Sequence, residues 1–438
     1  MGVTLRRRSL AAVAILATAA LGLVACSKSD DANTGSSSTE QITLNVDVFG
    51  NFGYEELYKK YMQDHPNIKI VERGTGGQLG DFTQQVTQRI AAGSGLGDVL
   101  AVEEGMSIDI KAKGNNFVDL KEYGAAELSG NFLDWKVAGM TTDDGKIIGL
   151  GTDVGGMAMC YRTDLFKKAG LPTERDKVSA LWPTWNDYIT VGKQFKANPA
   201  VKDAGFLDAV TNTYNTILMQ EAGNTTGYTY FDKQGNYVTD SNPAVKKAWD
   251  LSVEILNAGL SAKLQAWTPE WNNGFKNAKF ATIACPAWMT GYITSQNGDA
   301  GKGKWDIAKA PGNGGNWGGS WLAVPKQSKH PKEAAELAKF LTSPEGQIAA
   351  FKSKGNLPSS PKALDDPAVK AAVNEYFSNA PTGQIYGEGA KLLKPVYLGA
   401  KNVPVRTAVE NALRTVEQGT RKADAAWTAA VADGKKAA

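Results

Sequence analysis

The sequence is poor in histidine and cysteine, and this scarcity removes several kinds of enzyme from consideration. Its 438 residues contain two histidines, His65 and His330, and three cysteines. Each histidine precedes a proline in a polar setting, which is typical of a surface loop. A zinc site and a serine–histidine–aspartate triad both depend on these residue types, so we expect no metal site and no such triad.

Strong net charge and long apolar runs are lacking as well. The formal net charge is +3 and the basic residues are scattered, so we expect no nucleic acid as a partner. The longest apolar run, at residues 10–25, has only 16 residues, which is too short to span a bilayer comfortably.

The N-terminus has the features of an export signal. Three arginines at residues 6–8 precede the apolar run, which ends in Leu-Val-Ala followed by Cys26. This ending resembles a bacterial lipobox, in which the cysteine becomes the lipidated first residue, and a plain signal peptide cut elsewhere is the alternative. The arginines leave both twin-arginine and general secretory export open. We expect residues 1–25 to be removed and Cys26 to anchor the protein on the extracytoplasmic face of the cell membrane.

The rest of the chain predicts a short tether and a large folded part. Residues 26–40 are small and polar without periodicity, as expected of a flexible tether. The mature chain of about 410 residues is longer than one hydrophobic core usually supports, so we expect two large lobes.

Hydrophobic periodicity at the start of the folded part predicts an α/β fold. Residues 42–49, 68–72 and 98–102 have the pattern of strands, and residues 54–64 and 82–92 that of helices between them. Strands alternating with helices in this way predict a parallel sheet with right-handed crossovers. Later runs predict further strands at 157–161, 280–285 and 321–324.

The ends of these strands are candidate ligand-binding positions. Ligands of parallel sheets bind outside the carboxyl ends of the strands. Asn51 and Phe52 follow the first predicted strand, and Glu103 and Glu104 follow the third. We therefore expect these residues to lie near a ligand.

Tryptophan is concentrated in one stretch. Six of the eleven tryptophans fall within residues 267–321, namely Trp267, Trp271, Trp288, Trp305, Trp317 and Trp321. Several are flanked by glycine, proline or asparagine, which is typical of loops. Flat aromatic faces among amides and carboxylates suit a ligand that is apolar on its ring faces and polar at its rim, as a sugar is. Ordinary core packing is the alternative for each of them.

Motifs for chemistry are weak or incomplete. The glycine-rich segment at residues 298–304 fits the first seven positions of a phosphate-binding loop, but its eighth residue is Trp305 and no apolar strand precedes it. Glu104 and Asp153 are carboxylates that a glycosidase could use, but binding of ligand hydroxyls explains them as well. We therefore expect no catalytic residues and no cofactor.

Cys160 and Cys285 are the two cysteines that remain after Cys26. An oxidising compartment permits a disulfide between them. Two buried free thiols are the alternative, and the sequence leaves both open.

A series of short segments in fixed order resembles a known family. The segments are residues 98–104, YRTDLF at 161–166 with AGLP at 169–172, PTWNDY at 183–188, residues 275–288, GGSWLAVPK at 318–326, and residues 341–345 and 405–409. Together they are similar to the family 1 extracellular solute-binding proteins of ABC transporters, which include the maltodextrin-binding protein. Within that family, residues 151–155, 284–286 and 315–319 most resemble the actinobacterial cellobiose- and cello-oligosaccharide-binding lipoproteins.

The resemblance implies a type II periplasmic-binding-protein fold of two α/β lobes with the ligand in the cleft between them. The chain would cross between the lobes near residues 150–153, 317–319 and 341–345. The implied boundaries are 41–150 plus 318–343 for lobe 1, and 151–317 plus 344–438 for lobe 2. An ABC permease would be the partner, and we expect a monomer.

The resemblance also suggests ligand residues. Trp288 falls at the family's sugar-stacking position, but Asn402-Val403-Pro404 stand where the maltodextrin-binding protein has another stacking tryptophan, so maltodextrin is not the favoured ligand. Cellobiose or cellotriose is favoured, with xylobiose or chitobiose as alternatives and a secreted glycoside hydrolase as a different class. The expected ligand-binding residues are Asn51, Phe52, Glu104, Asp153, Trp271, Trp288, Trp317, Gly318, Gly319 and Trp321.

Overall fold

The computed structural model describes residues 41–74, 79–312, 314–391 and 393–438. The predicted signal peptide, the tether and Cys26 lie outside these residues. Within the described part of the chain, no helix is both long and apolar enough to cross a membrane.

The strands of the described residues form one curled sheet with the order β2-β1-β3-β8-β4-β6-β5, and β7 and β9 both pair with β4. Their bounds are β1 Ile42–Asp47, β2 Ile68–Arg73, β3 Val99–Glu103, β4 Leu150–Arg162, β5 Gly205–Leu207, β6 Phe280–Pro286, β7 Trp305–Ala308, β8 Asn316–Ala323 and β9 Leu357–Pro358. The predicted α/β class is confirmed, because β1 runs parallel to both β2 and β3, with helices in the connections.

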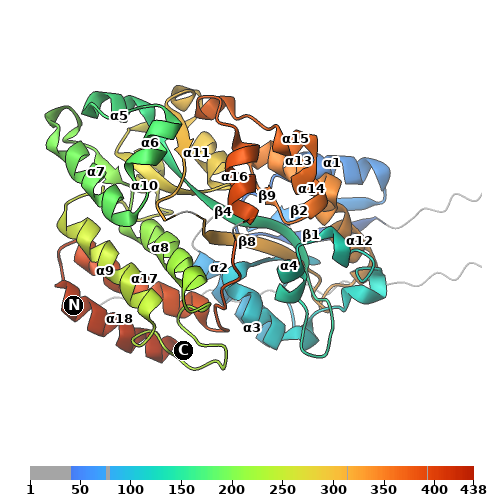
Figure 1. Ribbon diagram of the computed structural model, residues 1–438. Helices are drawn as coiled ribbons and strands as arrows, with labels where there is room; N and C mark the ends of the chain where they lie inside the picture. Colours follow the sequence, from blue (N-terminus) through green and yellow to red (C-terminus); the bar gives the residue numbers. More distant parts are fainter. Residues whose placement is uncertain (1–40, 75–78, 313, 392) are drawn as a thin grey trace, which may run out of the picture. The chain divides into compact units, whose positions relative to one another are not determined.

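The helices that periodicity predicts at residues 54–64 and 82–92, and further along the chain at 185–197, 243–258, 331–341, 405–418 and 424–432, are present in the structure. Helices of the first part of the chain are α1 Glu55–Asp64, α2 Leu79–Ala92, α3 Ser107–Ala112, α4 Asp134–Gly139, α5 Thr163–Ala169, α6 Arg175–Leu181, α7 Trp185–Ala197, α8 Val210–Asn224 and α9 Pro243–Asn257. Those of the second part are α10 Pro269–Lys276, α11 Met289–Asn297, α12 Pro331–Thr342, α13 Pro344–Lys354, α14 Pro361–Asp365, α15 Pro367–Lys370, α16 Thr382–Lys391, α17 Asn402–Glu417 and α18 Ala423–Ala437. Helices α8, α9, α17 and α18 pack beside one another (Figure 1).

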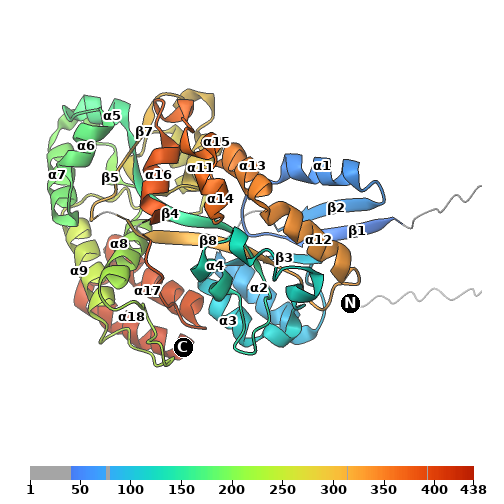
Figure 2. The same ribbon diagram turned by 45° about the vertical axis from the view of Figure 1, so that its right-hand side comes forward.

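Strands β4 and β8 connect two parts of the sheet. The strand predicted at 157–161 is the second part of β4, which begins earlier and is continuous over 13 residues. Its first half pairs with β8, and its second half pairs with β6 and β7. The two strands lie side by side between β1–β3 and the helices α5 to α9 (Figure 2).

Helix α8 is the main element that the periodicity did not predict. Most of its residues are buried, including polar ones such as Asn212, Asn215 and Gln220. Because several sides of the helix are covered, apolar residues are not confined to one stripe, and the pattern of an amphipathic helix is lost. The buried amides of Asn212, Asn215 and Gln220 are hydrogen-bonded instead, as when Gln220 Nε2 donates to the carbonyl oxygens of Pro311 and Gly314.

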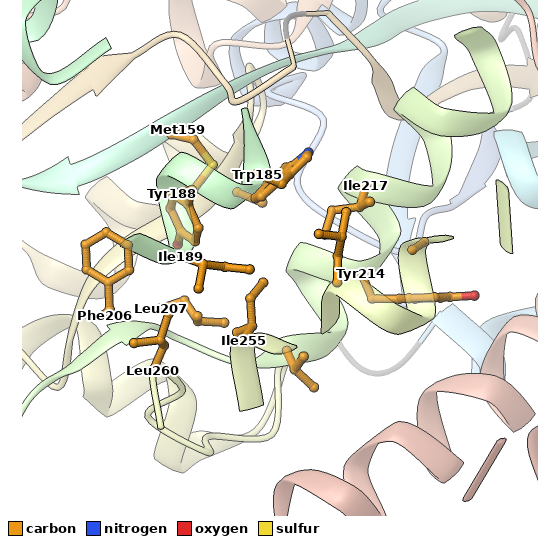
Figure 3. Close-up of a cluster of buried hydrophobic side chains, with 14 of the residues drawn as sticks. Met159, Trp185, Tyr188, Ile189, Phe206, Leu207, Tyr214, Ile217, Ile255 and Leu260 are labelled. Atoms are coloured by element: carbon orange, nitrogen blue, oxygen red, sulfur yellow. The ribbon is translucent and has the colours of Figure 1, made fainter. Parts of the chain in front are cut away.

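The apolar cores lie on both sides of the β4–β8 pair. One cluster joins β1, β3 and α12, with Leu44, Val99 and Leu337 among its buried members. Another joins β4, α7, β5, α8 and α9, and Figure 3 shows Tyr188, Phe206 and other members of it together.

Helix α13 contributes to more than one core. Ala350 packs with the cluster of β1 and α12, whereas Phe351 packs with a cluster around β6. The predicted lobe boundary at 343/344 therefore falls at the start of a helix that packs against two different apolar clusters. The lobe boundaries stay a prediction.

A disulfide joins Cys160 of β4 to Cys285 of β6. The two strands are antiparallel neighbours, and the register places Ala158 opposite Cys285 and Ile283 opposite Cys160. Of the two alternatives that the sequence left open, the structure contains the disulfide.

We expect the variant Cys160→Ala/Cys285→Ala to be less stable by about 2–4 kcal/mol, because a bond across a long loop restricts the unfolded chain. Urea unfolding followed by circular dichroism measures this change. Wild-type protein that is unfolded and refolded in reductant should show the same lower midpoint. An unchanged midpoint for the variant would contradict the prediction.

A glycine permits the close approach of β4 and β8. A Cβ atom at Gly155 would lie 1.9 Å from the carbonyl oxygen of Trp317. We expect Gly155→Ala to lower the free energy of unfolding by about 1–3 kcal/mol or more, since neither backbone can yield without breaking the pairing. The matched control is Gly387→Ala in α16, where a Cβ meets nothing within 4 Å. Equal urea midpoints for the two variants would show that the contact is unimportant.

Candidate functional site

A small cavity lies between the end of β3, the start of β8 and the helices α8 and α17. Its volume is about 20 Å³, and it is lined by Glu103, Glu104, Asn215, Leu218, Met219, Thr229, Tyr230, Trp317, Gly318, Leu398, Asn402 and Arg406. A cavity of this size admits one water molecule and no sugar. A ligand as large as a disaccharide therefore requires the walls to separate.

Two consecutive carboxylates form one wall. Glu103 is the last residue of β3, and its carboxylate accepts the backbone N–H of Gly105 at 2.7 Å. Glu104 begins the 3₁₀ turn Glu104–Met106, and its Oε2 accepts from Asn316 Nδ2 at 2.5 Å. These bonds fix both carboxylates at the end of the strand, where the rule for parallel sheets predicted them.

The opposite wall is polar and carries a cation. Arg406 of α17 lies 3.9 Å from a carboxylate oxygen of Glu410, whose carboxylate also accepts from Asn215 Nδ2 at 2.7 Å. Thr229 Oγ1 donates to Asn402 Oδ1 at 3.4 Å. Amides and hydroxyls donate and accept hydrogen bonds, as ligand hydroxyls also do.

The charged groups around the cavity shift one another's pKa values. Burial raises the pKa of Glu104 to about 8, and the neighbouring charges of Glu103 and Asp153 add to this effect, whereas the charge of Lys136 opposes it. Burial also raises the pKa of Glu103 and of Asp153. Burial lowers the pKa of Lys136 to about 8, against the attraction of the three carboxylates. The pKa values of Glu104 on the wall and of Lys136 behind it thus both lie near 8.

Three partly exposed tryptophans run from the cavity toward α10 and α11, and we call them the aromatic series. Trp317 lines the cavity. Trp288 donates its indole N–H to the Trp317 carbonyl at 3.1 Å, and the ring centroids are 6.0 Å apart at an interplanar angle of 73°. Trp267 stacks on Trp288 at 6.0 Å with an interplanar angle of 28°.

Several residues expected from the sequence meet at this place. Glu104, Trp317 and Gly318 line the cavity. Trp288 packs against Gly318, since a Cβ there would lie 3.3 Å from the indole nitrogen. Gly319 lies behind the wall, where a Cβ would come within 3.0 Å of Lys136 Nζ.

Other expected residues lie elsewhere. Asn51 is exposed, and its side chain accepts the backbone N–H of Gly53. Phe52 is buried between Phe49 and Tyr54 in the core around β1. Neither is among the residues that line the cavity. Both residues lie in the connection 48–54 between β1 and α1, which does not reach the cavity.

Two tryptophans expected to be platforms are core residues in the structure. Trp271 is 0% exposed and donates its indole N–H to Asp208 at 2.7 Å. Trp321 is 2% exposed and donates to the carbonyl oxygen of Lys136 at 2.8 Å. Their ring faces are covered by protein, so neither can stack on a ligand in this conformation.

Asp153 is also placed behind the wall rather than on it. Its side chain is buried, and Oδ1 accepts from Thr152 Oγ1 at 2.6 Å. It therefore acts on the site through its charge rather than by contact.

Sequence reasoning gave no role to Arg406, Asn215 or Lys136. Arg406 belongs to the segment 405–409 that resembled the family. This resemblance helped to identify the family but gave Arg406 no function. Asn215 lies on the helix whose pattern was lost, and nothing in the sequence distinguished Lys136 from a surface lysine.

Comparison with known proteins identifies the family. The family model for bacterial extracellular solute-binding proteins matches residues 56–376. One solved crystal structure, of an extracellular solute-binding protein of family 1, has a sequence 41% identical to this chain and a TM-score of 0.76. The match covers 90% of this chain and 99% of that chain. The ABC transporter associated binding protein from B. animalis subsp. lactis Bl-04, in complex with β-1,6-galactobiose, has the same fold, with 21% identity and a TM-score of 0.77 over 90% of this chain and 96% of that one.

Curated relatives are more distant. The arabinooligosaccharide-binding protein of Bacillus subtilis (strain 168) is 27% identical over 307 residues, which are 66% of this chain and 65% of the relative. The lactose-binding protein of Rhizobium radiobacter is 27% identical over 295 residues, 65% of each chain. The chain thus spans 65% of the length of both relatives. From the family model and the 41% identical structure, we conclude that this chain belongs to the extracellular solute-binding proteins, a family of binding proteins rather than enzymes.

Proposed function

We propose that this protein is the substrate-binding lipoprotein of a carbohydrate ABC importer and that it captures cellobiose and short cello-oligosaccharides. The observation that carries the proposal is the cavity, which brings carboxylates, a guanidinium, amides and an aromatic ring into one place. The polar groups suit sugar hydroxyls, because charge-assisted hydrogen bonds are the stronger kind.

A β-1,4-linked glucan is the favoured ligand because it is flat and presents successive apolar faces. Trp317 and Trp288 would stack on these faces, and Glu104 and Arg406 would bond hydroxyls from opposite walls. The relatives described as binding arabinooligosaccharide, lactose and β-1,6-galactobiose support a carbohydrate without fixing its linkage. Xylobiose and chitobiose are the alternative ligands.

The mechanism is capture without chemistry. A ligand that contacts both Glu104 and Arg406 holds the two walls together, so it binds the closed state better than an open one and shifts the population toward closure. The closed form would then dock on the permease. Micromolar affinity needs about −8 kcal/mol, which stacking and several hydroxyl contacts together can supply.

Anchoring and localisation are part of the proposal. Residues 1–25 would be removed, Cys26 would carry the lipid, and residues 27–40 would tether a monomeric binding domain to the extracytoplasmic face of the membrane. The apolar run and the Leu-Val-Ala-Cys26 ending support this arrangement.

A calorimetric titration of residues 41–438 tests the ligand. Cellobiose or cellotriose should give saturable heat with one site per chain and be recovered unchanged, whereas maltose should bind much more weakly. Xylobiose, chitobiose and lactose complete the panel. Heat with another of these sugars would reject the cello-oligosaccharide, cleaved sugar would favour a glycoside hydrolase, and silence with every sugar would reject the carbohydrate receptor.

Truncation of the aromatic series tests the site. We expect Trp317→Ala and Trp288→Ala each to weaken binding about tenfold or more, equivalent to about 1.4 kcal/mol. The matched control is Trp427→Ala, a partly buried tryptophan that packs on Trp249 at 5.1 Å between α18 and α9. A similar loss in all three variants would indicate a general structural effect, and no loss in the first two would place the sugar elsewhere.

A further inference from the structure

Lys136 is a buried cation directly behind the carboxylate wall of the cavity. It lies on the short helix α4 and is 1% exposed. Its ammonium donates to the carbonyl oxygen of Ser320 at 3.2 Å and lies 3.6 Å from the ring centroid of Trp321. The strand register explains the position, since Ser320 pairs with both Glu103 of β3 and Asp153 of β4.

Three carboxylates interact with the charge of Lys136, and each comes from a different neighbouring segment. Glu103, Glu104 and Asp153 act on it from β3, the following turn and β4. On the opposite wall, Arg406 of α17 acts on both glutamates and is balanced by Glu410. The phenols that interact with these groups are Tyr54, near Asp153, and Tyr230, near Arg406.

This group holds more carboxylates than cations. A buried carboxylate is costly unless a cation or hydrogen bonds compensate it. Asn316 donates to one oxygen of Glu104, and Lys136 is the neighbouring charge that most strongly favours the ionised form of Glu104. Without Lys136, the Glu104 carboxyl would hold its proton more tightly and would be a weaker acceptor for a ligand hydroxyl.

We propose that Lys136 is a positioning residue that favours the anionic, hydrogen-bond-accepting form of Glu104 on the cavity wall. It acts through Glu104 and not by touching the ligand, since Lys136 is not among the residues that line the cavity. The use of Glu104 for a sugar rests on the proposed function, whereas the effect of Lys136 on Glu104 is a property of the free protein.

Carboxyl ¹³C NMR of glutamate-labelled protein tests the effect without a ligand. The Glu104 resonance is assigned by its loss in Glu104→Gln, and its titration is followed in wild type, Lys136→Met and Asp153→Asn. Removing the cation should raise the pKa of Glu104 by at least about one pH unit, and removing the neighbouring anion should lower it. Lys246→Met, which removes an exposed lysine of α9, is the control and should change nothing.

A folded Lys136→Met protein with an unchanged Glu104 titration would overturn the proposal, because a purely structural lysine would leave it unmoved. If Lys136→Met does not fold, Asp153→Asn is compared with Lys136→Met/Asp153→Asn, in which one buried charge of each sign is removed. Glu104 should then titrate at a higher pH in the double variant than in Asp153→Asn. Equal titration of Glu104 in these two variants would reject the role of Lys136.

Calorimetry with cellobiose links this effect to binding. Wild-type affinity should rise with pH as Glu104 ionises, and in Lys136→Met the rise should move to higher pH. An equal loss of affinity at every pH would contradict the positioning role. If wild type binds no cellobiose, the proposed ligand fails, and the NMR titration alone decides the role of Lys136.

Discussion

The close pairing of β4 with β8 is the constraint on which the rest of the structure depends. The first half of β4 pairs with β8, and the second half extends into a different set of strands. Gly155 permits this approach because any side chain there would collide with the Trp317 carbonyl. At the same place β8 supplies Trp317 and Gly318 to the cavity. A strand of the pair that joins the two parts of the sheet therefore also forms part of the site.

Buried charge is the second organising feature. Glu103, Glu104 and Asp153 gather where β3, β4 and β8 meet, and Lys136 lies among them. A charge cluster of this kind contributes little to stability compared with an apolar core of the same volume. Its position beside the cavity fits the proposed role in binding, where preorganised acceptors are useful. The same buried carboxylates thus account for the shifted pKa values and for the proposed recognition of sugar hydroxyls.

The sequence predicted those features that follow from local periodicity. The first strands and helices, and the placement of Glu104 at a strand end, needed only the alternation of apolar residues and a rule about parallel sheets. Helix α8 could not be found in this way because it is buried on several sides and carries buried polar residues, such as Asn215 and Gln220, whose amides bond other parts of the protein. Lys136 was missed because a lysine is rarely buried, and nothing local signals that it is. Trp271 and Trp317 looked alike in sequence, and only tertiary packing separates the buried ring from the one at the cavity.

The crystal structure of the protein with the sugar that binds most tightly would test the central claim most directly. We expect the sugar between the carboxylate wall and α17, with a hydroxyl bonded to Glu104, another bonded to Arg406 and a ring face against Trp317 or Trp288. The walls should be farther apart than in the cavity described above, because that cavity has room for a water molecule only. A sugar bound elsewhere, or bound without contact to Glu104, Arg406 and the aromatic series, would contradict the account.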